Sequence, residues 1–599
     1  MFDSAANCFL NALVREFEQW EYAKLPPEVT QASGYPYGFR CILDGEKSIY
    51  LPLIEYSYFG RSYIFHKQYS YNHTEKTFIE YGFSQFLQLL GQHLEMFTDT
   101  KLGEPQLQNL LKVLHRAHES TVNINNVLTH RQNDLERIYN QDLNFIDSEQ
   151  SLLVGHSIHP CPKSRSGFDE ADEKLYVPEY ANEFQLHWFA VKKDILFVFA
   201  GNETPLESYC HDLVVNNPEL KQLANSLKSD FVLIPCHPWQ AKHWKANKQL
   251  TEYFINHQLV DLGPQGPAWS ATSSLRSLYQ ADAPWMIKFS LSTQLTNSVR
   301  HLQPEEMIRG QIIEKVLSSK KFQKMEQEVS SFNIMREPIS IALKGIDGEA
   351  LDSTAIIWRQ NPFYQNLNPS ESTEVLSGLL QDLPNSPDNR LSLRLKALAE
   401  KSQSEPSHLA QAFLRNFLQV VIKPIIIAQA KYGLLFGAHQ QNIVITFDSQ
   451  LIPIKAYFRD CQGTGFSSLA RELYGEELLS ETINSGNLFE SDTVIHLFAY
   501  YLMLNSFFNT ISSLTLPKLL SEEAALDIYR EFLLQLKAEN LPDPRVIDYL
   551  LDSEYIWSKG NFFCNLHDIN ENTMADPFSI YHRLKNPLYA SFESIGSVA

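Results

Sequence analysis

The amino-acid sequence predicts an α+β protein of about three lobes. The chain is too long for a single hydrophobic core, and its apolar periodicity changes from one segment to another. The chain has 599 residues, too many for a single hydrophobic core, so roughly two to four domains are expected. Helical periodicity runs through 81–140, and short apolar runs of strand length alternate with polar segments in 183–235. Long helices are expected at 407–431 and 492–515, on either side of a strand pair at 443–458.

Three other segments bear on the organisation of the chain. Residues 361–390 are rich in Pro, Asn and Ser, which predicts an interdomain or surface segment. Residues 1–20 have the pattern of an amphipathic helix and lack the basic-then-apolar layout of a signal peptide. The apolar run 494–508 is expected to be too short to span a bilayer. A cytoplasmic protein is therefore expected.

Composition excludes several classes of protein. The net charge is −20, which argues against nucleic acid or an anionic membrane as the main partner. The net charge does not exclude small anionic substrates, because an acidic protein can contain a basic pocket. The seven cysteines are scattered and contain no CxxC pair, so neither a disulfide framework nor a zinc site is expected.

A loop at 155–165 carries two histidines, a lysine and an arginine within ten residues, and its prolines and glycine exclude a regular helix. These are His156, His159, Lys163 and Arg165. So many hydrogen-bond donors suit phosphate or carboxylate binding. The alternative is a solvated basic loop with one histidine bonded to the backbone.

A β-hairpin is predicted by alternating apolar runs on both sides of Asp282. In the expected register, Arg276 lies opposite Lys288. Ser274 then lies opposite Ser290, and all four side chains share one face. Like charges paired across a sheet are unfavourable unless an anion lies between them, so this pairing favours an anionic ligand. The alternative is a register shifted by one residue, with both cations diverging into water.

The segment after this hairpin is predicted to begin a helix. Ser292 or Thr293 can cap it, and Thr296 and Arg300 would then share one face at i and i+4. Free N–H groups at the start of such a helix would add an anion site beside Lys288.

A second hairpin at 443–458 brings Asn442 and Asp460 together at its open end. An amide oxygen beside a carboxylate suits Mg²⁺, which keeps several waters and bridges nucleotide phosphates. The alternative is a turn-capping asparagine and an Arg459–Asp460 surface pair.

Together these groups suit a reaction between two polyanions. ATP carries about four negative charges and citrate about three, and unit charges in contact repel by several kcal/mol at low effective dielectric. Arg, Lys, His and Mg²⁺ would lower the barrier to pressing a carboxylate oxygen against the α-phosphate. The chain contains no GxxxxGK[ST], GxSxG or nucleotide-type GxGxxG motif.

With these residues in view, the chain resembles the siderophore synthetases that work independently of peptide synthetases, the aerobactin-synthetase-like family. The resemblance covers most of the chain. It rests on the following motifs: HxxHPxxK at 156–163, HPWQ at 237–240, the Ser-x-Arg hairpin, Lys288 with Thr296 and Arg300, HQQN at 439–442, Arg459-Asp460, KGNFFC at 559–564, Asn570-Glu571-Asn572 and Asn586-Pro587.

The resemblance implies a cupped hand around a central cleft for ATP and the acid. Residues 1–150 would form a mostly helical thumb, and 151–395 would form mixed α/β fingers with the ATP-phosphate hairpin. Residues 396–599 would form a palm of helices around the second hairpin. Such enzymes adenylate a carboxylate, pass it to an amine or hydroxylamine-type nucleophile, and release AMP and pyrophosphate. They are commonly homodimers. Segments 156–163, 288–300 and 559–577 are most similar to the citrate-using branch, which serves iron acquisition.

The resemblance also implies a role for each matching residue. ATP would be bound by His159, Lys163, Ser274, Arg276, Ser277, Lys288, Gln441, Asn442 and Asp460, of which Asn442 and Asp460 would also hold Mg²⁺. Citrate would be bound by Thr296, Arg300 and His439. The catalytic groups would be His439, Arg300 and Lys288. The chain departs from the pattern at Gly437, where many members carry glutamate, so a third metal-binding carboxylate is not implied.

Two rival functions use the same residues. A kinase-like phosphotransferase would use Asn442 and Asp460 for Mg²⁺ and would release ADP. A non-catalytic protein that binds citrate or a ferric siderophore would explain the basic groups but leave the Asn/Asp pair without a role.

Overall fold

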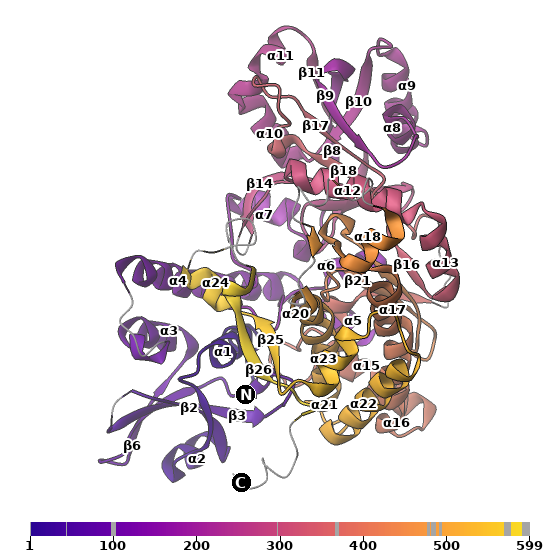
Figure 1. The fold of residues 1–599 in the computed structure, drawn as a ribbon. Helices are drawn as coiled ribbons and strands as arrows, with labels where there is room; N and C mark the ends of the chain where they lie inside the picture. Colours follow the sequence, from indigo (N-terminus) through magenta and orange to yellow (C-terminus); the bar gives the residue numbers. More distant parts are fainter. Residues whose placement is uncertain are drawn as a thin grey trace.

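The computed structural model describes residues 2–43, 45–97, 103–295, 298–365, 371–475, 487–489, 494–567 and 577–589, together with Ser480 and Ile569. Helices and strands alternate along the whole described chain (Figure 1). The expectation of an α+β fold is therefore confirmed.

The N-terminal part combines the expected helices with an antiparallel sheet that the sequence analysis did not anticipate. The helices predicted within 81–140 are present as α3 (Phe83–Gln92), α4 (Glu104–His130) and α5 (Leu135–Asn140). The sheet has the order β1-β2-β3-β5-β6, with β4 beside β3. Its strands are β1 (Glu21–Lys24), β2 (Tyr37–Ile42), β3 (Lys47–Glu55), β4 (Tyr63–Ile64), β5 (Gln68–Asn72) and β6 (Thr77–Tyr81).

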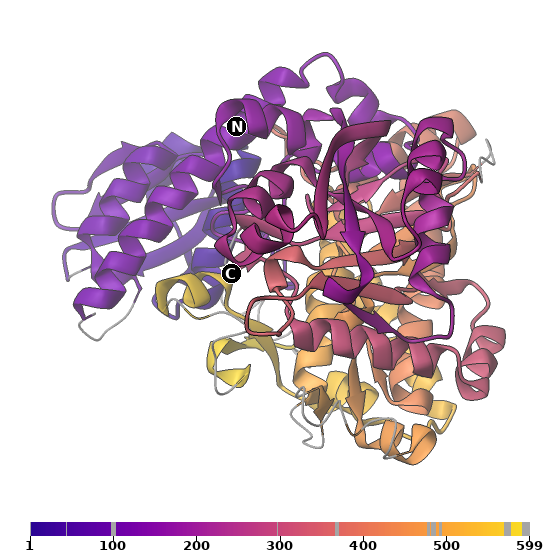
Figure 2. The same ribbon diagram turned by 90° about the horizontal axis from the view of Figure 1, so that it is seen from above.

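The expected amphipathic N-terminal helix is α1 (Ser4–Glu16), and Asp3 caps it by accepting from the N–H groups of Ala5 and Ala6. Its apolar face packs into the same hydrophobic core as α3 and α4. Phe562 and Leu566 of α24 (Asn561–His567) complete this core from the far end of the sequence. Figures 1 and 2 show the C-terminal segment lying beside α1 and α4.

The middle of the chain forms an eight-stranded antiparallel sheet, which lies at the top of Figure 1. Its order is β10-β8-β11-β12-β13-β18-β17-β9. The strands are β8 (Glu183–Lys192), β9 (Leu196–Ala200), β10 (Phe231–Cys236), β11 (Leu259–Ala271), β12 (Ser277–Tyr279), β13 (Trp285–Phe289), β17 (Ile339–Leu343) and β18 (Ile356–Gln360). Alternation along β13 buries Ile287 and Phe289 in the core.

The predicted hairpin exists as β12 and β13, but its predicted register was wrong by one residue. Lys288 pairs with Ser277, not with Arg276. The connection between the two strands, in which the N–H of Ala283 donates to the Gln280 carbonyl, sets this register. A tight turn precedes β12: the N–H of Leu275 donates to the Thr272 carbonyl, and the N–H of Thr272 donates to the Ser277 carbonyl. This turn takes residues 272–276 out of the strand, so β12 begins only at Ser277.

The helix predicted after this hairpin was also wrong. Residues 291–295 form strand β14 (Leu291–Leu295), which pairs with β15 (Ser298–Arg300) and with β7 (Arg165–Ser166). The next helix, α12, begins only at Pro304. A partner strand from 130 residues earlier in the chain thus overrides the local capping signal. Thr296 lies outside the described residues.

The C-terminal part is built around two long buried helices. One comprises α16 (Pro406–Phe417), a π-helical turn (Leu418–Ile422) and α17 (Lys423–Tyr432). Pro424 cannot donate a hydrogen bond and would crowd the carbonyl one turn back, which accounts for the wider turn before it. The other comprises α20 (Val494–Ala499), a second π-helical segment (Tyr500–Phe507) and α21 (Phe508–Thr515).

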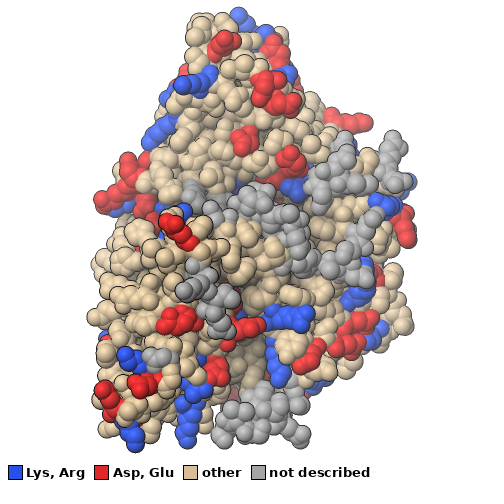
Figure 3. All heavy atoms as spheres, turned by 60° about the vertical axis from the view of Figure 1, so that its left-hand side comes forward, with Lys and Arg blue, Asp and Glu red and all other residues tan. Residues whose placement is uncertain are grey.

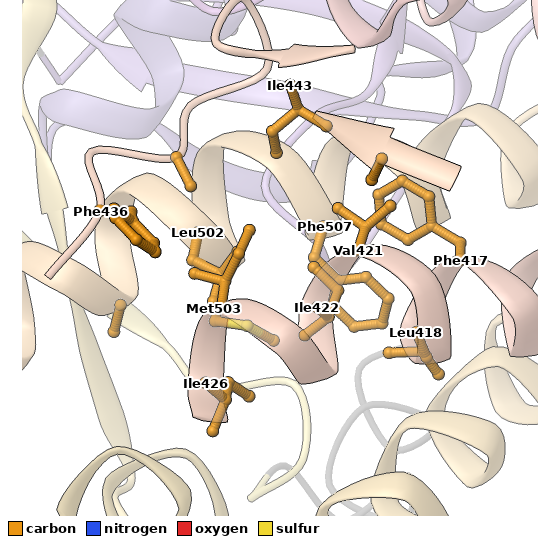
Figure 4. Close-up of a cluster of buried hydrophobic side chains, with 14 of the residues drawn as sticks. Phe417, Leu418, Val421, Ile422, Ile426, Phe436, Ile443, Leu502, Met503 and Phe507 are labelled. Carbon is orange, nitrogen blue, oxygen red and sulfur yellow. The ribbon is translucent and has the colours of Figure 1, made fainter. Parts of the chain in front are cut away.

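These two helices pack against each other and against the second hairpin. Figure 4 shows Phe417, Val421 and Ile422 of one helix beside Leu502, Met503 and Phe507 of the other, with Ile443 above them. The hairpin, β21 (Ile443–Phe447) and β22 (Pro453–Phe458), has the predicted pairing, with Ile443 opposite Phe458.

Both helices are long and apolar enough for membrane spans, including the one that contains the apolar run 494–508. The expectation that this run is too short does not hold for the whole helix, which has 22 residues. However, 61% and 83% of their apolar windows are buried inside the protein. Packing in the core therefore accounts for their composition.

The segment 361–390, expected at the surface or between domains, is largely buried where it is described. Glu374 of β19 (Ser372–Val375) forms a fully buried ion pair with Arg390. Asp382 forms another with Arg61 of the N-terminal part. Its polar residues are buried because ion pairs and hydrogen bonds satisfy them, which composition alone does not reveal. On the outer face in Figure 3, acidic and basic side chains are interspersed over the surface.

Candidate active site

A cavity of about 370 Å³ lies where residues from the middle of the chain meet the C-terminal part. It is lined by side chains from the loop 152–165, the turn after β11, strands β13, β15 and β18, the HQQN segment, the end of β22, the π-helical segment 500–507 and residues 559–561. The predicted site residues that line it are His159, Lys163, Ser274, Arg276, Ser277, Lys288, Arg300, His439, Gln441, Asn442 and Asp460. The structure therefore brings together every predicted site residue that it describes.

The turn between β11 and β12 presents hydroxyl and guanidinium groups to the cavity. Leu275 is in the left-handed conformation, with φ of 67°, and its side chain is anchored in the core at 3% exposure. The hydroxyl of Thr272 donates to the Ser277 carbonyl over 2.8 Å, and the N–H of Ser277 donates to the Ser274 hydroxyl over 3.3 Å. Core packing and these hydrogen bonds thus fix the turn before any ligand binds.

Arg276 contacts backbone rather than a carboxylate. Its Nη1 donates to the carbonyl of Arg300 over 3.1 Å. This bond ties the turn to β15, and it brings two of the predicted anion-binding arginines close together. The shifted register therefore does not send the cations into water, as the alternative predicted, because Lys288 is 3% exposed.

Lys288, which is buried, forms an ion pair with Asp460, whose side chain is 33% exposed at the cavity surface. Arg359 of β18 donates to the same carboxylate over 3.2 Å, and Arg359 is itself paired with Glu337. Burial alone would raise the pKa of Asp460, but Lys288 and Arg359 outweigh it and hold that pKa well below its ordinary value. Asp460 is therefore ionised, and it adopts a left-handed backbone with φ of 78°.

The HQQN segment is held by hydrogen bonds on both sides. The N–H of Asn442 donates to the His439 carbonyl over 2.8 Å, and its side-chain amide donates to the Gly437 carbonyl over 3.2 Å. The N–H of Gln440 donates to the side-chain oxygen of Asn505 over 3.1 Å. His439 lies with its ring 6.2 Å from that of Tyr501.

The basic loop is buried rather than solvated, so that part of the alternative was wrong, but the expected hydrogen bond between a histidine and the backbone is present. Lys163 is paired with Glu179, and Arg165 lies 3.1 Å from Glu173. The N–H of Cys161 donates to Nδ1 of His159 over 3.1 Å, so the neutral ring carries its proton on Nε2. Burial holds the pKa of His159 well below its ordinary value, which keeps that ring neutral near pH 7.

His156 lies beside it, partly buried, and is also neutral. Burial lowers the pKa of His156 to about 3, with a further contribution from His439. Its Nε2 lies 2.8 Å from the side-chain nitrogen of Asn505. The pair connects the loop to the π-helical segment 500–507.

Several cavity residues were not assigned a role from the sequence. They are Arg359, Arg459, Tyr500, Tyr501, Asn505, Lys559 and Asn561. Lys559 and Asn561 lie in a motif that carried the family resemblance, so that motif contained a usable signal. Arg359 lies in an apolar strand, and the tyrosines lie in an apolar helix, where local sequence gives no indication of a site.

The cavity lining contains a few side chains whose oxygen atoms could bind a hard metal cation. Asn442 and Asp460 both line the cavity. Within the described ranges, no group of three or more His, Cys, Asp or Glu side chains could hold a metal ion. These donors suit a cation that is bound mostly by substrate and water, as Mg²⁺ usually is.

Comparisons with known proteins agree with this architecture. The model of the IucA / IucC family matches residues 144–381. A curated relative from Escherichia coli, N(2)-citryl-N(6)-acetyl-N(6)-hydroxylysine synthase, is 31% identical over 597 residues, covering 98% of both chains. The chain belongs to the IucA/IucC family. The synthase of the same name from Vibrio mimicus is 35% identical over 464 residues and 77% of each chain.

Structural comparison agrees with this family relationship over nearly the whole chain. The structure of ATP-bound aerobactin synthetase IucA from Klebsiella pneumoniae matches with a TM-score of 0.87 and 28% identity, covering 99% of this chain and 100% of that one. Residues 411–574 also match the model described as ferric iron reductase FhuF-like transporter. The IucA/IucC fold thus includes the helices and the second hairpin of the C-terminal part.

Proposed function

We propose that this protein is an ATP-dependent siderophore synthetase that adenylates a carboxylate of citrate and condenses it with an amine, releasing AMP and pyrophosphate. The observation that carries the proposal is the single cavity lined by the residues predicted for ATP and for citrate. The names of its relatives, which are citrate-condensing synthases, support a ligase. They do not favour the phosphotransferase or the binding protein.

The phosphates of ATP would bind between the turn after β11 and the floor of the cavity. Ser274 and Ser277 supply hydroxyls there, and Arg276 and Lys288 supply positive charge. His159 adds a neutral Nε2–H donor, and Lys163 adds a cation whose charge is already compensated by Glu179. Preorganised donors of this kind stabilise charge that develops at the α-phosphate without further reorganisation.

Magnesium fits beside Asn442 and Asp460, with Gln441 contacting the nucleotide. The metal would neutralise phosphate charge when it is bound. Lys288 and Arg359 hold the Asp460 carboxylate in place. Gly437 supplies no carboxylate, so the protein offers two oxygen ligands in this region.

Citrate would bind opposite the phosphates. Arg300 would hold a carboxylate, with Thr296 and His439 beside it. His439 would also assist the reaction at the carboxylate, since its ring lies at the cavity surface. The side chain of Arg276 donates a hydrogen bond to the backbone carbonyl of Arg300, so the proposed acid site and the proposed phosphate site are directly connected.

The charges of the described lining favour a nucleophile that bears a carboxylate. Glu179 and Asp460 are the carboxylates among the described lining residues, and each is paired with two cations. A second ammonium on a diamine would find no free counter-charge among them. We therefore propose an amino-acid derivative, in agreement with the hydroxylysine derivative in the names of the two relatives.

We further propose the three-lobed arrangement of thumb (1–150), fingers (151–395) and palm (396–599), a cytoplasmic location and a homodimer. The hydrophobic cores follow this division only in outline, because residues 312–332 and 376–395 of the proposed fingers pack in the core of the palm, and Phe562 and Leu566 of the proposed palm pack in the core of the thumb. The bounds rest on the family resemblance. The homodimer rests on the family resemblance alone.

The deciding experiment measures pyrophosphate release with ATP and Mg²⁺ across a panel of carboxylic acids, with hydroxylamine as a generic nucleophile. Release that depends on citrate and is accompanied by AMP is expected. Formation of ADP would support a phosphotransferase instead. No turnover with any acid, together with measurable citrate binding, would support the binding protein.

A further inference from the structure

One buried carboxylate, which does not itself line the cavity, connects three of the chain segments that do. Glu149 lies in α6 (Phe145–Gln150) and is 1% exposed. It forms a two-oxygen ion pair with Arg459, whose Nη2 lies 3.2 Å from its Oε2. The same Oε2 accepts from the backbone N–H of Ser273 over 2.9 Å.

Arg459 extends this contact to the HQQN segment. Its Nε and Nη2 both donate to the Gln441 carbonyl, over 3.1 and 2.7 Å. The side-chain amide of Gln441 in turn donates to the Ser273 hydroxyl over 3.3 Å. Ser273, Gln441 and Arg459 all line the cavity, and Glu149 does not.

The geometry points to Glu149 as a positioning residue for the nucleotide end of the site, an inference that rests on the function proposed above. One carboxylate fixes the start of the turn that carries Ser274, Arg276 and Ser277. Through Arg459 it also fixes the end of β22, where Asp460 follows. Ser273 and Arg459, which are 186 residues apart in sequence, are thereby held at a fixed distance from each other.

Physical chemistry explains why a charged pair is needed here. A neutral replacement such as glutamine can still accept from the Ser273 N–H, but its amide then faces the Arg459 guanidinium as a second donor. The arginine would remain buried without a counter-charge, a state that proteins relieve by moving the charge. The turn and the HQQN segment would then separate, and ATP binding would weaken before citrate binding does.

The experiment compares Glu149→Gln with Glu374→Gln. Glu374 is equally buried and paired with Arg390 and Arg394, but neither of these arginines lines the cavity, whereas Arg459 does. Both variants lose one buried counter-charge, so a general loss of stability affects both. We expect Glu149→Gln to raise KM for ATP at least tenfold while KM for citrate stays within twofold, and Glu374→Gln to change neither.

Equal effects of the two variants on KM for ATP would overturn the inference. If Glu149→Gln does not fold, Glu149→Asp decides the question. Aspartate keeps the charge but is too short to reach Arg459 and the Ser273 N–H together, so at least a threefold rise in KM for ATP is expected, and an unchanged value would refute the role. Citrate-dependent turnover by the wild-type enzyme is measured in parallel, and its absence would count against the proposed function itself.

Discussion

Replacing Lys288 with methionine tests the phosphate site most directly. Methionine keeps much of the volume of the lysine stem and removes the ammonium. After the change, Arg359 is the remaining ion-pair partner of Asp460 among the described residues, at 3.2 Å. We expect two separate effects, one on ATP and one on stability.

The effect on ATP follows from Coulomb's law. A unit charge about 4 Å from a phosphate charge is worth about 4 kcal/mol at an effective dielectric constant of about 20. Each 1.4 kcal/mol corresponds to about tenfold in rate, which gives a limit of about 10³. Arg276 and Arg359 remain in the cavity lining and offset part of this loss. A fall of about 10²- to 10³-fold in kcat/KM for ATP is therefore expected.

The effect on stability should be smaller than for a fully buried pair. Removing one partner of such a pair costs about 3–5 kcal/mol. Here the Asp460 side chain is 33% exposed and keeps a second cation, so about 1–3 kcal/mol is expected. Urea unfolding measures this loss independently of activity.

The assay is pyrophosphate release at saturating citrate with ATP varied. Lys423→Met is the matched control, because Lys423 pairs with Glu539 outside the cavity and should leave kcat/KM unchanged. A value for Lys288→Met within threefold of the wild type would refute the assignment of Lys288 to the phosphates.

Three further predictions concern citrate, acid stability and one helix end. Arg300→Ala should abolish citrate-dependent pyrophosphate release while changing ATP affinity, measured by calorimetry, less than threefold; unchanged turnover would remove Arg300 from the acid site. Burial lowers the pKa of His237 from 6.5 to about 3. Below about pH 6.5 the unfolded chain therefore binds a proton at His237 that the folded state does not bind. The contribution of His237 to the free energy of unfolding is present above about pH 6.5 and is lost as the pH falls toward 3. It amounts to about 2 kcal/mol between pH 7 and pH 5. His237→Asn keeps an acceptor for the Trp239 N–H and should reduce the loss of unfolding free energy over that range by about 2 kcal/mol, while His156 and His159 keep the remaining pH dependence; an unaltered pH slope would contradict this. Gly433→Ala should destabilise the protein by at least about 2 kcal/mol, because φ is 67° and the new Cβ would lie 2.5 Å from the Ala470 nitrogen. Gly34→Ala, with φ of 84° and open space around it, should cost only about 1 kcal/mol, and equal losses would show that the contact with Ala470 is unimportant.

Elements whose signal is local could be predicted from the sequence. The helices of 81–140, the long helices and the second hairpin each follow from periodicity within a single segment. The N-terminal sheet was not predicted because its edge strands β1 and β6 are exposed on both faces. Alternation of polar and apolar residues is weak in such strands.

Long-range contacts decided the elements that were predicted wrongly. The segment 291–300 has a plausible helix cap, but pairing with residues 165–166 makes it a strand. The start of β12 at Ser277 depends on the left-handed Leu275, whose conformation is stabilised by burial of its side chain in the core. Neither contact is visible in the local sequence.

The site was predictable where its chemistry resides in short motifs. Lysine, arginine and histidine within a few residues of one another indicated anion binding, and the cavity contains them. The supporting pairs were not predictable. Glu149 and Arg459 lie 310 residues apart in sequence, and nothing near either one indicates its partner.

The π-helical segment at 500–507 has a consequence for how this enzyme can vary. In an α-helix, successive side chains rotate by about 100°, so residues 500, 501 and 505 would spread around the axis. The wider turn, in which each carbonyl bonds to the fifth residue onward, brings Asn505 back over Tyr500 and Tyr501, and all three line the cavity. Loss of one residue here would restore an ordinary helix and rotate Asn505 away from Gln440. Homologues should therefore keep the number of residues in this stretch constant, even where its core-facing side chains differ.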